Sequence, residues 1–410
     1  MANTLSRTAD QTAPRQSSLW TEPREWLICR WLNRIKAGCL TVEFPSGTRA
    51  VFEGAEPGPH ASLTIRNLRL VTRLVLSGDI GFAESHMAGE WDTQDLSVLL
   101  TLGAVNADAF SIAIAPSPIM RIANRLYHAF RTNTRRGSRR NIAAHYDLGN
   151  DFYGQWLDET MTYSSALFAT PDENLAAAQR RKYLRLAEQL ELSPGDRVLE
   201  IGCGWGGFAE IAAAKFGCQV VGLTLSVEQA AYARERMQRA GISDAVEIRI
   251  QDYRDVKGQF DKIVSVEMFE AVGEKYWPDY LQILHARLKP QGKAALQIIT
   301  IDDDNFDQYR SNPDFIQRYI FPGGMLPGPK AFENAVARTP LLIRDAMYFG
   351  ESYAETLRRW DRDFQHNWPR IASLGFDDRF YRMWRYYFCY CEVGFDTGEI
   401  DVAHFLLERP

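Results

Sequence analysis

The sequence predicts an α/β protein with a doubly wound, mostly parallel sheet in its larger C-terminal part and a smaller N-terminal α+β domain. Two observations support this prediction. From residue 175 onwards, short apolar segments with strand character alternate with amphipathic helical segments, which is the pattern of a parallel sheet covered by helices. Residues 37–75 instead alternate apolar and polar side chains around the turn Pro45-Ser46-Gly47, which is typical of a β-hairpin.

The N-terminal third is predicted to be a small domain between two less regular segments. Residues 1–20 are rich in Ser, Thr, Gln and Ala and are expected to be a poorly ordered tail. The α+β domain covers residues 21–120, with a hairpin, a further strand at 62–66, and a helical region at 80–105 that Gly81, Gly89 and Trp91 interrupt. Residues 121–141 are expected to be a basic linker, and the larger domain covers residues 142–410.

The larger domain is predicted to contain five strands joined by helices. The expected strands are 197–201, 219–223, 246–250, 262–266 and 294–301, and the expected helices are 173–191, 207–216, 226–241 and 275–288. Ser226 and Gln229 have the spacing of a capping box, which fixes the start of the third of these helices. The segment Lys289-Pro290-Gln291-Gly292 is expected to end the last one.

Composition and charge restrict the classes of function. The chain has 410 residues and a formal net charge of −5, which argues against a general nucleic-acid binder. Residues 1–140 nevertheless carry 17 Lys and Arg against 12 Asp and Glu, so this basic third is expected to meet an anionic surface. The six cysteines follow no zinc-ligand spacing, and no apolar run reaches the ~18–20 residues of a membrane span. These features predict a cytoplasmic protein without a metal site or a disulfide framework.

The most informative motif is a glycine-rich loop between a buried strand and a helix, containing Glu200, Gly202, Gly204 and Gly206. Small residues allow a ligand to approach the backbone, and the helix N-terminus adds a partial positive charge. The spacing is not that of a dinucleotide site, and the Lys of a phosphate-binding P-loop is missing. The pattern E-x-G-x-G-x-G instead resembles motif I of class I S-adenosylmethionine-dependent methyltransferases, which implies that cofactor.

Further cofactor contacts are expected at the ends of the next two strands. The second strand in this superfamily is usually followed by an acidic residue for the ribose hydroxyls, but here it is followed by Thr224 and Leu225. Thr224 and Gln229 can supply hydrogen bonds instead, although Gln229 also has its capping role. Gln251 and Asp252 end the third strand, where an acidic group can accept a hydrogen bond from the adenine amine. The alternative for Asp252 is a simple role in ending the strand.

Four further segments narrow the resemblance: His145–Tyr153, Met161–Ala166, Val266–Gly273 and Tyr319–Pro327. With the glycine loop, they resemble the cyclopropane-fatty-acyl-phospholipid synthase family from about residue 35 to the C-terminus. The resemblance implies a seven-stranded methyltransferase sheet and methyl transfer to a cis double bond of an unsaturated acyl chain in a membrane phospholipid. Attack by the alkene leaves a carbocation, and a base then removes a proton so that a cyclopropane ring closes. A methyl- or methylene-branched chain without ring closure is the alternative.

The resemblance also implies that the base is a bound bicarbonate ion. Its side-chain ligands in the family are a Cys, a Glu, a His and a Tyr, and these positions are occupied here by Ser165, Glu270, Gln297 and Tyr353. Two of the four differ from the family pattern. Ser and Gln can still form hydrogen bonds to an oxyanion, so an altered bicarbonate site is expected, in which Glu270 matters most.

The same resemblance implies roles for three residues near the start of the larger domain. His145 begins a segment that covers the cofactor, and Tyr163 and Ser164 match residues that contact its methionine part. Glu267 lies three residues before Glu270, so both can face one pocket, although a solvated or capping carboxylate is the alternative for Glu267. Aromatic residues of the C-terminal part are expected to stabilise the carbocation or to pack a core.

The implied partners are an unsaturated phospholipid in the bilayer and a second copy of the chain in a homodimer. The basic linker, with Arg135, Arg136, Arg139 and Arg140, is interpreted either as a solvated loop or as a peripheral contact with the anionic inner face of the membrane. Two other functions stay open. A methyltransferase for a small molecule or nucleic acid would need no basic linker, and a non-catalytic lipid-binding protein would need neither the glycine loop nor Glu270.

Overall fold

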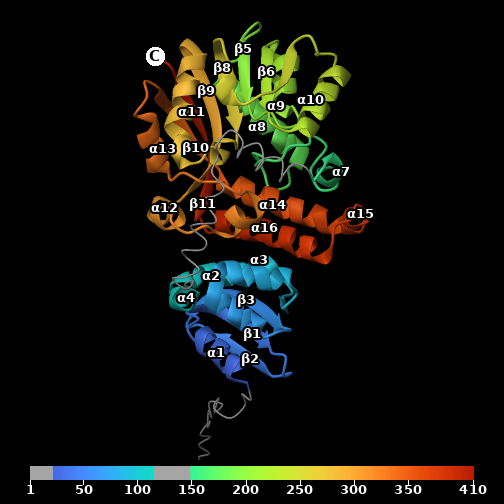
Figure 1. Cartoon of the computed structure of the whole chain (residues 1–410), viewed down its shortest axis with the longest axis vertical. Helices are drawn as coiled ribbons and strands as arrows, with labels where there is room; N and C mark the ends of the chain where they lie inside the picture. Colours follow the sequence, from blue (N-terminus) through green and yellow to red (C-terminus); the bar gives the residue numbers. More distant parts are fainter. Residues whose placement is uncertain (1–21, 115–147) are drawn as a thin grey trace, which may run out of the picture.

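A seven-stranded sheet forms the centre of the larger domain in the computed structural model, which describes residues 22–114 and 148–410 (Figure 1). Its strands are β5 (Arg197–Ile201), β6 (Gln219–Thr224), β7 (Val246–Ile250), β8 (Phe260–Val266), β9 (Leu288–Ile301), β10 (Leu342–Tyr348) and β11 (Ile400–Glu408). They lie in the order β10-β11-β9-β8-β5-β6-β7. The strands from β9 to β7 are parallel, whereas β11 and β10 add antiparallel strands at one edge. The predicted doubly wound, mostly parallel sheet is therefore confirmed.

Helices cover both faces of this sheet (Figure 1). They are α8 (Leu175–Gln189), α9 (Gly207–Phe216) and α10 (Val227–Arg239) on one face, and α11 (Trp277–Arg287) and α13 (Pro329–Val336) on the other. Side chains alternate accordingly, since Val198 packs with the first group and Leu199 with the second. The predicted cap is present, because the Ser226 hydroxyl accepts a hydrogen bond from the Gln229 backbone N–H at 3.3 Å. The five parallel strands β5 to β9 deliver their C-terminal residues to the same edge of the sheet.

Strand β9 begins earlier than the sequence predicts. Residues 289–292 were expected to end a helix, but α11 ends at Arg287 and the following residues are already extended. Their backbone pairs with the end of the chain: Gln291 N–H donates to the Arg409 carbonyl at 2.8 Å, and Arg409 N–H donates to the Gly292 carbonyl at 2.9 Å. This long-range pairing determines the conformation of a segment whose Pro and Gly resemble a helix stop.

The N-terminal domain is a four-stranded sheet with helices. Its elements are α1 (Pro23–Leu32), β1 (Ala37–Glu43), β2 (Arg49–Glu53), β3 (Glu56–Ile65), α2 (Arg69–Met87), β4 (Trp91–Asp92), α3 (Leu96–Val105) and α4 (Ala107–Ile114). Strands β1 and β2 form the predicted antiparallel hairpin. The helical region predicted at 80–105 is divided, because Gly89 adopts a φ of 68° after α2 and Trp91 then pairs with β3.

A helical layer lies between the two parts (Figure 1). It contains α14 (Gly350–His366), α15 (Trp368–Ser373) and α16 (Asp378–Asp396), and near it lie the short helices α7 (Asn150–Tyr153) and α12 (Asp303–Tyr309) and the π-helix η4 (Ile316–Ile320). The Ser97 hydroxyl donates to the Glu392 carboxylate, and the Tyr319 hydroxyl donates to that of Glu84, both at 2.6 Å. One hydrophobic cluster includes residues of α16 and of the N-terminal domain. The two parts therefore share a core.

Three predictions fall outside the described residues: the tail 1–20, the linker 121–141 and His145. Within the part of the chain that the structure describes, no helix is long and apolar enough to cross a membrane. The same residues contain no group of three or more His, Cys, Asp and Glu side chains that could hold a metal ion.

Candidate active site

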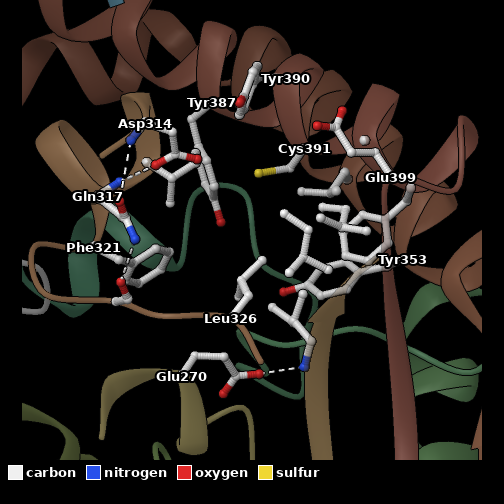
Figure 2. Close-up of a pocket in the computed structure, with 18 of the residues that line it drawn as sticks. Glu270, Asp314, Gln317, Phe321, Leu326, Tyr353, Tyr387, Tyr390, Cys391 and Glu399 are labelled. Carbon is white, nitrogen blue, oxygen red and sulfur yellow. Dashed lines mark hydrogen bonds between the residues drawn. The ribbon is translucent and has the colours of Figure 1, made fainter. Parts of the chain in front are cut away.

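A pocket of about 1170 Å³ begins at the carboxyl ends of β5, β6 and β8 and continues towards the N-terminal domain. Figure 2 shows Glu270 on one side of it and Tyr387, Tyr390 and Glu399 on the opposite side, with the Tyr353 hydroxyl directed into the space between them. Most of the remaining lining is apolar, including leucines of α2 and α3. One continuous space therefore connects the glycine loop, Glu267 and Glu270, and an apolar region.

The glycine loop has the backbone conformation that its sequence suggests. Gly202, Gly204 and Gly206 have φ values of 83°, 50° and 84°, which favour glycine. Gly202 and Gly204 line the pocket, and a Cβ placed on Gly204 would have no protein atom within 4 Å. Gly206 faces away and caps α9, where a Cβ would lie 2.9 Å from Met237. Two glycines thus open the pocket, and the third allows α9 and α10 to pack closely.

The residues after β6 and β7 divide into pocket-lining residues and a structural one. Thr224, Leu225, Gln229 and Gln251 line the pocket, and the Thr224 hydroxyl donates to the Gln229 side-chain carbonyl at 2.8 Å. The Asp252 carboxylate does not line it. That group accepts hydrogen bonds from the Arg254 guanidinium at 2.6 and 2.8 Å, and from the Arg254 backbone N–H. The expected acceptor for an adenine amine is therefore engaged elsewhere.

Glu200 is a buried acceptor without a complete set of partners. Its Oε2 atom has no hydrogen-bond partner among the described residues, and burial raises the pKa of the side chain to about 8. An ammonium group in the pocket would satisfy this oxygen. The Glu200 carboxyl and the open backbone at Gly202 and Gly204 together fit the amino-acid part of S-adenosylmethionine.

Tyr163 and Ser164 are held by residues that the sequence did not single out. The Tyr163 hydroxyl donates to the Tyr387 hydroxyl at 3.0 Å. Lys182 on α8 is fully buried, and its ammonium donates to the Ser164 hydroxyl at 2.6 Å. Burial lowers the pKa of Lys182 to about 7, while the charges of Glu267, Asp158 and Glu200 raise it. A buried amine whose charged form is favoured by these carboxylates therefore lies beside the candidate cofactor site.

Three of the four residues expected around bicarbonate surround the Glu267 carboxylate instead. Its Oε1 accepts from the Ser165 backbone N–H at 2.8 Å and from the Gln297 amide at 2.7 Å, and its Oε2 accepts from the Tyr353 hydroxyl at 2.7 Å. Ser165 contributes its main chain, because its hydroxyl donates to the Ala166 carbonyl at 2.8 Å. Neither the Ser165 nor the Gln297 side chain is exposed to the pocket.

Glu270 lies in the same pocket but outside this cluster. Its Oε1 accepts from the Ile299 backbone N–H at 2.5 Å, and its Oε2 has no partner among the described residues (Figure 2). Burial and the neighbouring charge of Glu267 raise the pKa of Glu270 to about 8. Glu270 is therefore protonated at neutral pH and does not repel the other carboxylate.

His404 on β11 is a further residue that the sequence did not reveal. Its Nε2 lies 2.9 Å from the Gln297 side-chain carbonyl, and burial lowers the pKa of the ring to about 3. A neutral ring that donates through Nε2 fixes the amide so that its N–H₂ faces Glu267. No local pattern connects the two residues, since they are 107 positions apart.

Comparison with known proteins identifies relatives over most of the chain. A family model described as mycolic acid cyclopropane synthetase matches residues 133–405. The chain is 42% identical over 378 residues to tuberculostearic acid methyltransferase UfaA1 of Mycobacterium tuberculosis, with 90% of this chain and 88% of the relative covered. It is 34% identical over 386 residues to the cyclopropane-fatty-acyl-phospholipid synthase of Escherichia coli strain K12, with 90% and 93% covered.

Solved structures agree with this assignment. The cyclopropane synthase MmaA2 from Mycobacterium tuberculosis aligns with a TM-score of 0.62 and 31% identity, covering 66% of this chain and 98% of the other. The mycolic acid cyclopropane synthase CmaA1, complexed with SAH and CTAB, aligns with a TM-score of 0.62 and 30% identity over the same shares. The chain therefore belongs to the cyclopropane-fatty-acyl-phospholipid synthase family and is an S-adenosylmethionine-dependent C-methyltransferase that modifies lipids.

Proposed function

We propose that this enzyme transfers the methyl group of S-adenosylmethionine to the cis double bond of an unsaturated acyl chain in a membrane phospholipid. The observation that carries this proposal is the single pocket that joins the glycine loop, Glu267 and Glu270 to an apolar space. An acyl chain can pack against the apolar part of this lining. A soluble polar substrate would leave most of this lining without favourable contacts.

The cofactor is held by the glycine loop in this proposal. The open backbone at Gly202 and Gly204 admits it, Glu200 accepts from its ammonium group, and Thr224 and Gln251 line the space beyond. Bound there, it supplies an electrophilic methyl group. The residues of the chain then exclude water and provide the surroundings for the positive charge that develops on the acyl chain.

Aromatic side chains provide part of those surroundings. Phe321, Tyr353 and Tyr387 line the pocket, and the faces of such rings attract a cation. Other aromatic residues of the C-terminal part pack a core instead, since Trp360 and Phe364 are fully buried. The role expected from the sequence therefore belongs to a subset of these residues.

The product favoured by the site is a methylene-branched chain. The family resemblance implies cyclopropane formation. The relatives of this chain include one named as a cyclopropane-fatty-acyl-phospholipid synthase and one named as a probable fatty acid methyltransferase. The site departs from the bicarbonate ligand set at Ser165 and Gln297, and a side-chain carboxylate occupies its centre. Ring closure is retained as the competing outcome.

Access to the phospholipid is proposed to occur at the cytoplasmic surface of the membrane. The basic character of residues 1–140 favours an anionic bilayer, and salt should weaken an electrostatic contact of this kind. Four arginines of the linker, at positions 135, 136, 139 and 140, are the candidates for this contact and lie outside the described residues.

The test of this function is mass spectrometry of acyl chains after incubation with the purified enzyme and S-adenosylmethionine. Vesicles of anionic or neutral phospholipid with one cis double bond per chain serve as substrates. We expect each modified chain to gain the mass of one CH₂ group, more rapidly in anionic vesicles, and fragmentation to locate a methylene branch. Saturated vesicles are the control, and a gain of mass in those vesicles would contradict addition at a double bond.

Gly204→Val is expected to abolish S-adenosylmethionine binding while the fold is retained. The branched side chain would project into the open space beside the loop, where the cofactor approaches the backbone. A left-handed φ of 50° also disfavours Val, at a cost of roughly 1–2 kcal/mol. Gly241→Val is a matched control, because this exposed glycine has a φ of 69° and also has no protein atom near its Cβ position. Calorimetry that detected equal affinity in both variants would contradict the assignment of the loop.

A further inference from the structure

The Glu267 carboxylate occupies the centre of the position where the resemblance places a bicarbonate ion. Resting on the function proposed above, we propose that Glu267 is the catalytic base and takes the place of bicarbonate. Three donors converge on it: the Ser165 backbone N–H, the Gln297 amide and the Tyr353 hydroxyl. A bicarbonate ion held by the same donors would have to displace this side chain.

The backbone at Glu267 is specialised for this position. Its φ of 49° lies in the left-handed region, where a residue other than glycine carries a cost of roughly 1–3 kcal/mol. The residue directly follows β8, and its N–H still donates to the Gln297 carbonyl at 2.8 Å. The strand register is therefore kept while the chain turns, and the side chain enters the pocket beside Glu270.

The charges around Glu267 suit a proton acceptor. Burial raises the pKa of Glu267, whereas the buried Lys182 cation and the Tyr353 hydroxyl lower it. The ammonium of Lys182 is positioned by its hydrogen bond to Ser164. The raised pKa makes the Glu267 carboxylate a better proton acceptor than an exposed glutamate, while the Lys182 ammonium favours its ionised form.

The other titratable groups packed around Glu267 are uncharged at neutral pH. Tyr353 keeps its proton, because burial and the charge of Glu267 hold its pKa well above the usual value. Glu270, with a pKa of about 8, also keeps its proton. His404, which lies behind the Gln297 amide, is neutral because burial lowers its pKa to about 3. Two neighbouring carboxyl groups with different surroundings thus divide into a base and a neutral acid.

The reaction step that needs this base follows methyl transfer. An acyl chain that has accepted a methyl group carries a positive charge on the adjacent carbon. A C–H bond of the new methyl group, or of a carbon attached to the charged carbon, breaks and its proton passes to a Glu267 oxygen. The electron pair closes a ring in the first case and forms a C=C bond in the second. The chain becomes neutral and the carboxylate becomes a carboxylic acid, so that charge and atoms balance.

The identity of the base bears on the product. The three hydrogen bonds hold the carboxylate in one place, so proton loss waits until a C–H bond of the cation comes within its reach. A hydride can move first and place the charge on the methyl-bearing carbon, which is tertiary. Loss of a methyl proton from that cation gives a methylene branch, the product favoured above.

Glu267→Gly tests the proposal, because glycine suits the left-handed backbone and leaves an empty anion site. In buffer depleted of carbon dioxide, we expect the wild-type enzyme to keep its activity and the variant to lose at least about 100-fold. Added bicarbonate should restore part of the activity of the variant and leave the wild type unaffected. Glu191→Gly is a matched control, because this exposed glutamate also has a left-handed φ, of 54°.

A binding measurement makes the test independent of turnover. Titration with ¹³C-labelled bicarbonate, followed by NMR, should detect a bound ion in Glu267→Gly and none in the wild type. The proposal is overturned if the wild type binds bicarbonate or depends on it, or if Glu267→Gly is fully active without it. If the wild type adds no carbon to any lipid, the proposed function fails instead, and the NMR titration still decides whether Glu267 fills the anion site.

Discussion

Lys182→Met is expected to lower methyl transfer at pH 7 by roughly 10- to 100-fold, within the range for a disturbed proton acceptor. Met has nearly the same length as Lys but no charge. The substitution therefore removes the cation that stabilises the ionised form of Glu267, together with the hydrogen bond to Ser164. Lys182 is completely buried and does not line the pocket, so both effects reach the substrate only through Glu267 and Ser164.

The pH dependence of this variant distinguishes loss of charge from loss of packing. Glu267 accepts a proton only when it is ionised, so activity rises with pH through its pKa. Removing a nearby positive charge raises that pKa, because the ionised carboxylate loses a stabilising neighbour. We therefore expect the acidic limb of kcat/KM against pH to move to higher pH in Lys182→Met, with part of the activity recovered in alkaline buffer.

Lys215→Met on the exposed side of α9 is the control for this experiment, since it removes a surface charge of the same kind. Its acidic limb should coincide with that of the wild type. A uniform loss of activity in Lys182→Met at every pH would show that the lysine acts through packing or its hydrogen bond to Ser164 and not through its charge. Calorimetry with S-adenosylhomocysteine separates either result from failure to bind the cofactor.

Features that depend on a few neighbouring residues were predictable from the sequence. The helix α9 was predicted with its observed bounds, because the glycines that precede it and Gly217 that ends it mark both termini. The N-cap at Ser226 is equally local. The predicted start of β9 was wrong, because the segment around Pro290 takes its conformation from pairing with Arg409 near the C-terminal end of the sequence.

The candidate site was predictable in its membership but not in its arrangement. Ser165, Gln297 and Tyr353 were expected near one another, and they converge on one carboxylate. Which glutamate lies at the centre depends on the left-handed backbone of Glu267, which its sequence neighbours do not determine. The orientation of the Gln297 amide depends on His404, a residue from another strand.

Glu270→Gln is expected to remove part of the pH dependence of folding stability. The pKa of Glu270 is about 8 in the folded protein, above the ordinary glutamate value of 4.5. The folded state therefore holds this proton more tightly than the unfolded chain does. The associated stability is fully present below pH 4.5 and is lost as pH rises towards 8, with a limiting slope of about 1.4 kcal/mol per pH unit.

The Gln variant keeps an acceptor for the Ile299 N–H and cannot ionise. Its free energy of unfolding should therefore exceed that of the wild type at pH 8, and the difference should shrink as pH falls towards 5. Glu200 also has a raised pKa of about 8 and contributes a slope of the same sign, so the informative quantity is the difference between variant and wild type. Glu228→Gln on the exposed surface of α10 serves as the control. Urea unfolding at several pH values measures the free energy of unfolding of all three proteins.

A difference between Glu270→Gln and wild type that stays constant from pH 5 to pH 8 would mean that Glu270 is already ionised in the folded protein at pH 5. Glu267 would then lie beside a second charged carboxylate.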